Sequence, residues 1–355
     1  APRGAPRRDR PYLSGPELLA AAIDRGDAPT ANAARAAHVV AVCNAIERAA
    51  EGSGSVAVPR GGLRSDDPES APPSRPAADG ADAAGDADVA RDAAVRLPPV
   101  GFGCSRYRGG EYVDRIDSIA TAIDAGYRLF DSAELYGNEA RIGDLLDAPG
   151  SPDRDGLFVV GKVWNTNHEH VAEACRGSLA ELGIDAFDAY LLHWPDAWAY
   201  QGPLSELADL PPAEQEALAF PTDADGDPET VDVSLADTWR RLERLHDEGL
   251  ARSIGACNVS ADQLETILDV ARVPPAVVQV ESHPYEPNTE VIEACHAEGI
   301  RVLAHSPLSA PGLLSEPVLA EVAADHDTTP AAVAIAYHVD RGVVPIPARF
   351  ATTWS

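Results

Sequence analysis

Short apolar segments recur at regular spacing along the chain after residue 97. Eight of them are rich in Val, Ile, Leu or Phe, and each has the length of one buried strand. They occupy residues 98–103, 128–133, 157–164, 187–194, 252–258, 276–282, 301–308 and 342–347. Because continuous apolar runs suit strands that are covered on both faces, this pattern predicts parallel strands inside an α/β protein.

Amphipathic segments lie between these apolar runs. Apolar residues recur at helical spacing in residues 113–127, 138–148, 169–183, 235–249, 261–271, 288–299 and 319–342. Several of these segments end at a glycine, which is a common residue at helix C-termini. Eight strands alternating with seven helices predict a (β/α)8 TIM barrel. A doubly wound sheet is the competing fold, but it would normally place a G-x-G-x-x-G turn after an early strand, and this sequence has none.

The chain divides into three parts. Helical spacing in residues 1–52 predicts a helical N-terminal remnant, and residues 53–96, rich in Gly, Ala, Pro, Ser and Asp, predict a flexible, disordered linker. Residues 97–355 form the predicted barrel, with a long acidic insertion at 199–230 after the fourth strand. The chain stops soon after the last strand, so we expect a C-terminally truncated barrel without its eighth helix. The sequence also contains no methionine, so we expect it to be part of a longer translation product.

The charge of the chain is strongly negative, with a formal net charge of −29. Almost all of this excess lies after residue 96, which argues against nucleic acid and anionic membranes as partners and favours a halophilic, acidic surface. No apolar run is long enough to cross a bilayer, and the N-terminus lacks the pattern of a secretory signal. The five cysteines form no C-x-x-C pair, so we expect a reducing, cytoplasmic setting and no metal site.

Polar residues occur at the ends of three neighbouring predicted strands. Asp131 ends the second predicted strand, Tyr136 lies in the next loop, and Lys162 and His193 end the third and fourth strands. Lys162 is the only lysine of the chain, although arginine is frequent. Each residue alone has another explanation: Asp131 as a helix cap, Tyr136 as a rim aromatic, His193 as a core histidine, and Lys162 as a lysine that survived by chance. Because adjacent strands lie about 4.8 Å apart, we expect the four side chains to meet at one rim of the barrel.

These residue types fit the reduction of a carbonyl group by hydride. Such a reaction builds negative charge on oxygen and needs a proton donor, and tyrosine is a poor one because its pKa lies near 10. A buried ammonium such as that of Lys162 favours the tyrosinate, so we expect it to lower the pKa of Tyr136. Asp131 would keep Lys162 charged and in place, and His193 would donate a hydrogen bond to the carbonyl oxygen.

The motifs FDSAELYGNE, FVVGKVW, YLLHWP, VQVESHPY and AHSPL stand in the order and spacing of the aldo-keto reductase family, which residues 97–349 resemble. The resemblance implies an NAD(P)H-dependent reductase of aldehydes and ketones, with Asp131, Tyr136, Lys162 and His193 as the catalytic tetrad. It favours NADP(H) over NAD(H). The cofactor-binding residues that it implies are Asp131, Cys257, Asn258, Gln279, His305, Ser306, Leu308 and Arg349. In this family a Ser commonly stands at position 257 and a stacking Tyr at position 305.

Trp164 and Trp194 adjoin the catalytic strand ends and are expected to line a pocket for a small carbonyl substrate, with core packing as the alternative. We expect a monomer. Two other functions stay open at this point: a non-catalytic, truncated barrel that binds nucleotide weakly, and a metal-dependent barrel hydrolase, for which the sequence offers no ligand set. Residues 10–60 resemble the C-terminal tail of glucose-fructose oxidoreductase-like dehydrogenases, without a catalytic motif.

Overall fold

The computed structural model of the chain describes residues 95–105, 107–108, 111–112, 116–205, 207–326 and 328–348. The predicted N-terminal remnant, the predicted linker except for its last two residues, and Arg349 lie outside the described residues.

Eight strands form a single curled sheet in which each strand pairs in parallel with its neighbour. In spatial order they are β1 (Phe102–Gly103), β4 (Leu129–Asp131), β5 (Phe158–Val163), β6 (Ala189–Leu192), β7 (Ile254–Cys257), β8 (Val277–Glu281), β9 (Arg301–His305) and β10 (Val343–Pro345). Each strand lies within one of the apolar runs of the sequence. The strand order follows the chain order, as in a (β/α)8 barrel.

Backbone hydrogen bonds join the first and last segments of this sheet. The Gly101 and Gly103 amides donate to the carbonyl oxygens of Pro345 and Pro347, at 3.0 and 3.1 Å. A Cβ atom at Gly101 would lie 2.8 Å from the Ile346 side chain, so glycine allows the two segments to approach. The sheet therefore closes into a barrel, which is the predicted fold.

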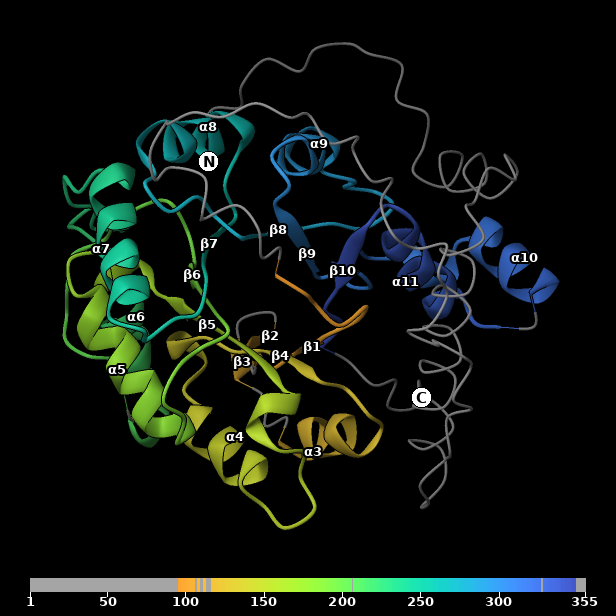
Figure 1. Cartoon of the computed structure of the whole chain (residues 1–355), viewed down its shortest axis with the longest axis horizontal. Helices are drawn as coiled ribbons and strands as arrows, with labels where there is room; N and C mark the ends of the chain where they lie inside the picture. Colours follow the sequence, from red (N-terminus) through yellow and green to blue (C-terminus); the bar gives the residue numbers. More distant parts are fainter. Residues whose placement is uncertain are drawn as a thin grey trace, which may run out of the picture.

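Helices connect successive strands and surround the barrel (Figure 1). They are α3 (Ile116–Asp124), α4 (Glu139–Leu146), α5 (Val171–Leu182), α7 (Leu235–Asp247), α8 (Ala261–Val270), α9 (Thr289–Ala297), α10 (Pro317–Asp325) and α11 (Pro330–Asp340). The segment 319–342, predicted as one helix, is divided between α10 and α11. The division has a local cause, because Pro330 occupies the start of α11 and the Thr329 side chain caps it by accepting from the Ala332 amide.

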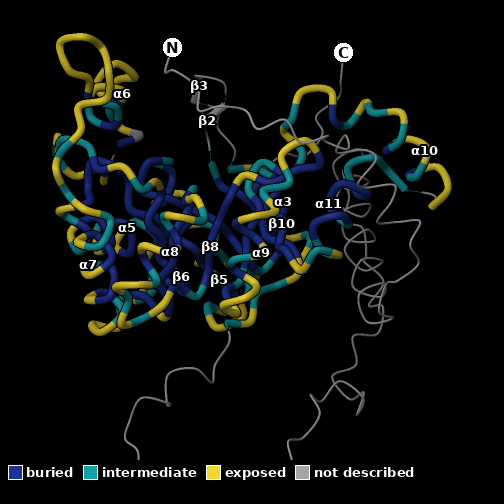
Figure 2. The backbone as a smooth tube through the Cα atoms, turned by 90° about the horizontal axis from the view of Figure 1, so that it is seen from above, coloured by how far each residue is buried: buried dark blue, intermediate teal, exposed yellow. Residues whose placement is uncertain are grey.

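The acidic insertion after β6 contains regular structure that its sequence did not predict. It holds the 3-10 helix Leu207–Asp209 and the helix α6 (Pro212–Ala219), and these lie with their flanking loops at one edge of the barrel (Figure 2). Leu204, Leu207 and Ala219 are buried in a cluster with Leu135 and Trp164. A short antiparallel pair, β2 (Tyr107–Arg108) and β3 (Glu111–Tyr112), follows β1.

The core has two layers. Inside the barrel, buried aliphatic side chains pack against one another, namely Leu129, Val160, Ala189, Leu191, Val277, Leu303, Val344 and Ile346. A larger apolar cluster fills the space between the strands and the surrounding helices. Because the barrel is filled with apolar side chains, the polar residues at its rim stand apart from the rest of the interior.

His338 of α11 is a polar exception within the apolar layer. It is fully buried, and neither ring nitrogen has a hydrogen-bond partner in the part of the chain that the structure describes. Burial, with a smaller influence of Arg341, lowers the pKa of His338 to about 3. The unfolded chain therefore binds a proton on this ring below about pH 6.5 while the folded chain does not, so stability falls as the pH falls from 6.5 toward 3.

Replacing His338 by leucine is expected to remove this acid sensitivity. The gain in unfolding free energy should be larger at pH 5 than at pH 7.5 by about 2 kcal/mol, which is the titration contribution of one such group. Urea denaturation of both proteins at the two pH values measures it. An equal gain at both pH values would contradict the assignment of the acid sensitivity to His338.

Candidate active site

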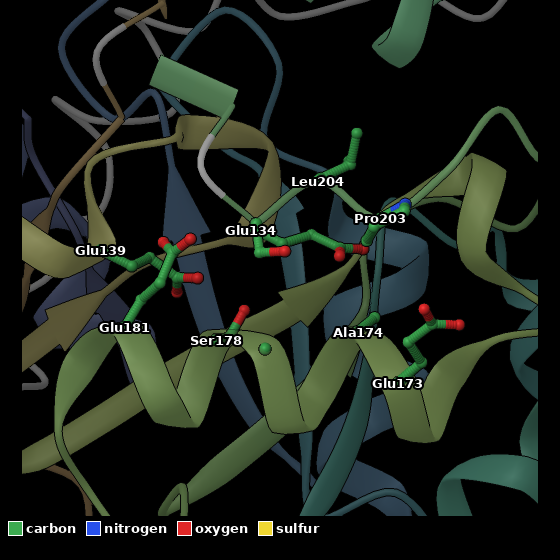
Figure 3. A pocket seen from close by; sticks show the side chains of 10 residues that line it. Glu134, Glu139, Glu173, Ala174, Ser178, Glu181, Pro203 and Leu204 are labelled. Carbon is green, nitrogen blue, oxygen red and sulfur yellow. The ribbon is translucent and has the colours of Figure 1, made fainter. Parts of the chain in front are cut away.

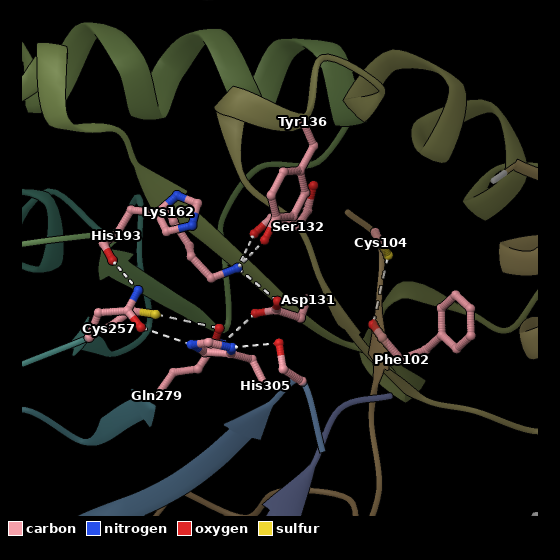
Figure 4. A network of polar contacts seen from close by, with 12 residues as sticks. Phe102, Cys104, Asp131, Ser132, Tyr136, Lys162, His193, Cys257, Gln279 and His305 are labelled. Carbon is pink, nitrogen blue, oxygen red and sulfur yellow. Dashed lines mark hydrogen bonds and ion pairs between the residues drawn. The ribbon is translucent and has the colours of Figure 1, made fainter. Parts of the chain in front are cut away.

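Parallel pairing brings the polar strand ends to the same rim. Asp131 stands opposite Val160 two residues before Lys162, and Cys257 stands opposite Gln279. The 3-10 helix Glu134–Tyr136 follows β4 directly and carries the tyrosine back over the rim. Figure 4 shows the side chains of Asp131, Tyr136, Lys162 and His193 gathered in one place, so the structure brings together all four residues of the predicted cluster.

Lys162 is the centre of this cluster. Its side chain is fully buried, and its Nζ atom donates to Asp131 Oδ2 at 2.7 Å and to the Ser132 carbonyl oxygen at 2.8 Å. The third contact of the ammonium is the Tyr136 hydroxyl, at 3.3 Å. Three acceptors match the three N–H donors of an ammonium group, so the charge is buried with its hydrogen bonds complete.

Asp131 is held from both sides. Its second carboxylate oxygen, Oδ1, accepts from Gln279 Nε2 at 2.7 Å. Because a carboxylate only accepts hydrogen bonds, the amide nitrogen of Gln279 must face Asp131. The Gln279 Oε1 atom therefore faces Cys257 and accepts from its thiol at 3.5 Å. The Cys257 thiol is a weaker hydrogen-bond donor than the serine hydroxyl that the family resemblance implies at this position, and it donates to the Gln279 side chain.

The pKa values of the central pair differ in part from the sequence expectation. Burial raises the pKa of Tyr136 above its ordinary value, and although Lys162 lowers it, this effect is the smaller one. The expected net decrease is therefore wrong, because the sequence reveals the ammonium but not the extent of desolvation. Burial lowers the pKa of Lys162, but the combined attraction of Asp131, Tyr136 and Cys257 outweighs it and the net pKa is raised.

His193 faces Tyr136 and Trp164. Its ring lies edge-on to both, with centroid distances of 5.9 Å to Tyr136 and 4.9 Å to Trp164. Burial holds the pKa of His193 well below its ordinary value, and the charge of Lys162 and the proximity of His305 act in the same direction. The imidazole is therefore neutral at physiological pH and carries one N–H for donation.

A hydrogen-bonded chain links three of the expected cofactor-binding residues to the catalytic rim. Asn258 Nδ2 donates to the His193 carbonyl oxygen at 3.0 Å, which leaves Asn258 Oδ1 to accept from His305 Nε2 at 2.8 Å. His305 Nδ1 then lacks a proton and accepts from the Ser306 hydroxyl at 3.1 Å. Burial lowers the pKa of His305 to about 4, which agrees with this neutral form.

Asn258 and Ser306 both have left-handed backbone conformations, with φ of 59° and 55°. Such conformations are uncommon for residues other than glycine and concentrate at functional sites. Leu308 is half-buried just beyond β9, and the eighth expected cofactor residue, Arg349, lies outside the described residues.

The two tryptophans differ in their surroundings. Trp164 is buried, its indole Nε1 donates to the Ala219 carbonyl oxygen at 2.7 Å, and its ring contacts Trp198 and Phe220. Trp194 keeps 43% of its surface exposed at the rim. Trp164 therefore belongs to an apolar wall beside the catalytic cluster, and the insertion completes this wall. Trp194 lies on the solvent-exposed side of the rim.

Sequence reasoning missed the polar groups that support this cluster. Glu134 and the Ser132 carbonyl oxygen lie between Asp131 and Tyr136 within the motif FDSAELYGNE, and the motif alone indicates no role for either. A charged residue among apolar neighbours at a strand end was the available signal. In the part of the chain that the structure describes, no group of three or more His, Cys, Asp or Glu residues could hold a metal ion, and no helix is long and apolar enough to cross a membrane.

Comparisons with known proteins agree with this arrangement. The sequence profile of the Aldo/keto reductase family matches residues 99–351. Aldo-keto reductase family 1 member A1-A of Danio rerio is 38% identical over 268 residues, which cover 71% of this chain and 77% of that protein. The human family 1 member A1 is 36% identical over the same shares.

Solved structures of aldose reductases are also similar to this chain. The aldose reductase of Schistosoma japonicum superimposes with a TM-score of 0.62 at 34% identity, covering 72% of this chain and 80% of that one. The aldose reductase of Giardia lamblia gives a TM-score of 0.61 at 31% identity, with coverages of 72% and 83%.

A parallel barrel with such relatives defines the protein as an NAD(P)H-dependent oxidoreductase. The chain belongs to the aldo/keto reductase family. Its reaction is the reduction of aldehydes or ketones to alcohols with a nicotinamide cofactor, and its substrates are small carbonyl compounds.

Proposed function

We propose that Tyr136 donates the proton to the substrate's carbonyl oxygen, and that Lys162, Asp131 and His193 support this step. The proposal rests on one observation, the 3.3 Å contact between the Tyr136 hydroxyl and the Lys162 ammonium. The ammonium is itself held by Asp131, whose Oδ2 atom accepts from it at 2.7 Å. His193, neutral and adjacent to the tyrosine ring, orients the carbonyl oxygen by donating a hydrogen bond.

The raised pKa of Tyr136 is compatible with this role. It keeps the phenol protonated before the reaction, as a proton donor must be. When the proton has moved to the substrate, the nearby Lys162 ammonium stabilises the phenolate that remains, because opposite charges attract strongly in a site away from water. Lys162 therefore stabilises the phenolate formed by proton transfer more than it affects the protonated tyrosine before the reaction.

We propose that the cofactor is held by the residues Asp131, Cys257, Asn258, Gln279, His305, Ser306, Leu308 and Arg349, and that NADP(H) is preferred over NAD(H). The amide groups of Asn258 and Gln279 have the donors and acceptors that a carboxamide requires, and they lie at neighbouring strand ends. The nicotinamide, when bound, supplies the hydride. Asn258 and His305 are bonded to each other at 2.8 Å, so a carboxamide that binds to Asn258 replaces this contact.

The substrate pocket is proposed to lie between Trp164 and Trp194. Trp164 contacts His193 edge-on, which puts an apolar wall beside the group that orients the carbonyl. Trp194 borders the open side. Such a pocket suits small carbonyl compounds with apolar substituents.

We also propose that the enzyme works as a monomer in the cytoplasm at high salt concentration, with neither nucleic acid nor membrane as partner. The net charge of −29 supports this, because a strongly negative surface repels nucleic acid and anionic lipid, and salt screens its self-repulsion.

Titration of NADPH fluorescence with the protein at high salt tests the cofactor assignment. We expect saturable binding of NADPH, weaker binding of NADH, and oxidation of the bound NADPH when an aldehyde from a panel of small carbonyl compounds is added. The replacement of Asn258 by alanine should weaken binding of both cofactors. Absence of saturable binding would reject the proposal and favour an inactive barrel.

A further inference from the structure

Glu134 is a buried carboxylate that the proposed mechanism does not use. It lies at the start of the 3-10 helix Glu134–Tyr136 with 4% of its surface exposed. Its Oε1 atom accepts from the Trp164 backbone amide at 2.5 Å, and its Oε2 atom accepts from Asn167 Nδ2 at 2.9 Å. Both donors belong to the segment that leaves β5, so Glu134 joins two successive strand ends.

The positions of these contacts connect the two proposed reacting groups. Tyr136 is two residues beyond Glu134, and Lys162 is two residues before Trp164. The backbone hydrogen bonds of the 3-10 turn are local, from the Tyr136 amide to Ala133 and from the Gly137 amide to Glu134. The Glu134 carboxylate therefore fixes this turn, and the tyrosine on it, relative to the end of β5.

The surroundings make a carboxylate at this position costly. Burial raises the pKa of Glu134 to about 8, although the hydrogen bonds from Trp164 and Asn167 oppose the shift. Figure 3 shows further carboxylates around the adjoining cavity, those of Glu139, Glu173 and Glu181. A leucine would avoid this desolvation and repulsion, but it would leave the Trp164 amide without an acceptor.

We propose that Glu134 is a positioning residue that sets the separation between the Tyr136 hydroxyl and the Lys162 ammonium by bridging the two strand ends that carry them. The proposal rests on the proposed role of Tyr136 as proton donor. Glu134 touches neither reacting group, so its effect is on the rate of the proton transfer and not on the binding of the cofactor.

A pair of substitutions tests the bridge. Glu134→Leu removes both acceptors, and we expect kcat to fall about tenfold to a hundredfold, since displacement of a reacting group by about 1 Å costs up to this much. The KM for the aldehyde and the Kd for NADPH should change little. Glu134→Gln should retain most of kcat, because its amide oxygen accepts from Trp164 and its amide nitrogen can donate to Asn167 Oδ1, which has no partner among the described residues.

Two further variants complete the design. Glu181→Gln removes a carboxylate from the same cavity without touching the bridge and should leave kcat unchanged. Asn167→Ala removes one of the two donors and should lower kcat by less than Glu134→Leu does, which keeps the proposal testable if Glu134→Leu does not fold.

The outcomes separate this inference from the proposed function. Wild-type kcat in Glu134→Leu and Asn167→Ala overturns the positioning role, even if Tyr136→Phe is inactive. Equal losses in Glu134→Gln and Glu134→Leu would mean that the hydrogen bonds of the bridge do not account for the effect, and a comparable loss in Glu181→Gln would mean that any change in the cavity lowers kcat; either result would also overturn it. Full activity of Tyr136→Phe would instead reject the proposed proton donor.

Discussion

Replacement of Tyr136 by phenylalanine is expected to lower kcat for aldehyde reduction by about 10²–10⁴-fold, the usual contribution of a positioned general acid. Phenylalanine keeps the ring, which packs edge-on to His193 and lies 5.1 Å from the Lys162 ammonium. The substitution removes only the hydroxyl, so the fold and the binding of NADPH should persist. The Lys162 ammonium loses one of its three hydrogen-bond acceptors, so we expect a small decrease in the free energy of unfolding.

Stopped-flow or steady-state oxidation of NADPH measures the loss, and circular dichroism and NADPH fluorescence check folding and binding. Tyr190→Phe is the matched control. Tyr190 lies in β6, is fully buried, and its hydroxyl has no hydrogen-bond partner among the described residues. It should keep wild-type kcat. If Tyr136→Phe also turned over at the wild-type rate, another group would have to supply the proton.

Replacement of Lys162 by methionine is expected to abolish activity and to destabilise the fold by about 3–5 kcal/mol, because it leaves the Asp131 carboxylate buried without its counter-ion. Methionine preserves the length and shape of the lysine stem, so the change isolates the ammonium. Asp131 keeps its contact with Gln279, which does not compensate a charge. Without the ammonium, nothing among the contacts of Tyr136 described above stabilises the phenolate.

Chemical denaturation gives the change in unfolding free energy, and a double variant separates the loss of stability from the loss of activity. Lys162→Met combined with Asp131→Asn removes both charges, so we expect part of the stability to return while activity stays absent. A single Lys162→Met protein as stable as the wild type would show that the buried ion pair does not contribute as the geometry indicates.

Much of the barrel could be predicted from the sequence because its strands are uniformly apolar. Polar residues such as Asp131 and Lys162 then stand out where strands end, and parallel pairing places those ends at one rim. The convergence of Asp131 and Lys162 follows from this register, whereas Tyr136 is brought to them by the 3-10 helix after β4. The closure of the barrel through Gly101 depends on a close approach of distant segments, which local periodicity does not reveal.

Other features depend on tertiary contacts and escaped prediction. The helix α6 has a weak amphipathic pattern, and its C-terminal end is placed by contacts of Ala219 and Phe220 with Trp164. Glu134 lies inside the motif FDSAELYGNE, but its bridging contacts could not be predicted because its partners, Trp164 and Asn167, lie some thirty residues away. The direction of the shift in the pKa of Tyr136 depends on how completely the phenol is buried, and only the packed structure reveals the extent of burial.

The hydrogen bond from Trp164 to the carbonyl of Ala219 has a consequence for engineering. Because the acceptor is a backbone carbonyl, a loop exchange that changes the path of the chain at residue 219 would leave the indole N–H without an acceptor in a buried position, at a cost of about 1–3 kcal/mol. Trp164 and the insertion therefore depend on each other structurally. Libraries that aim to alter substrate preference should vary the tryptophan and its loop together, since a change to either alone misaligns the other.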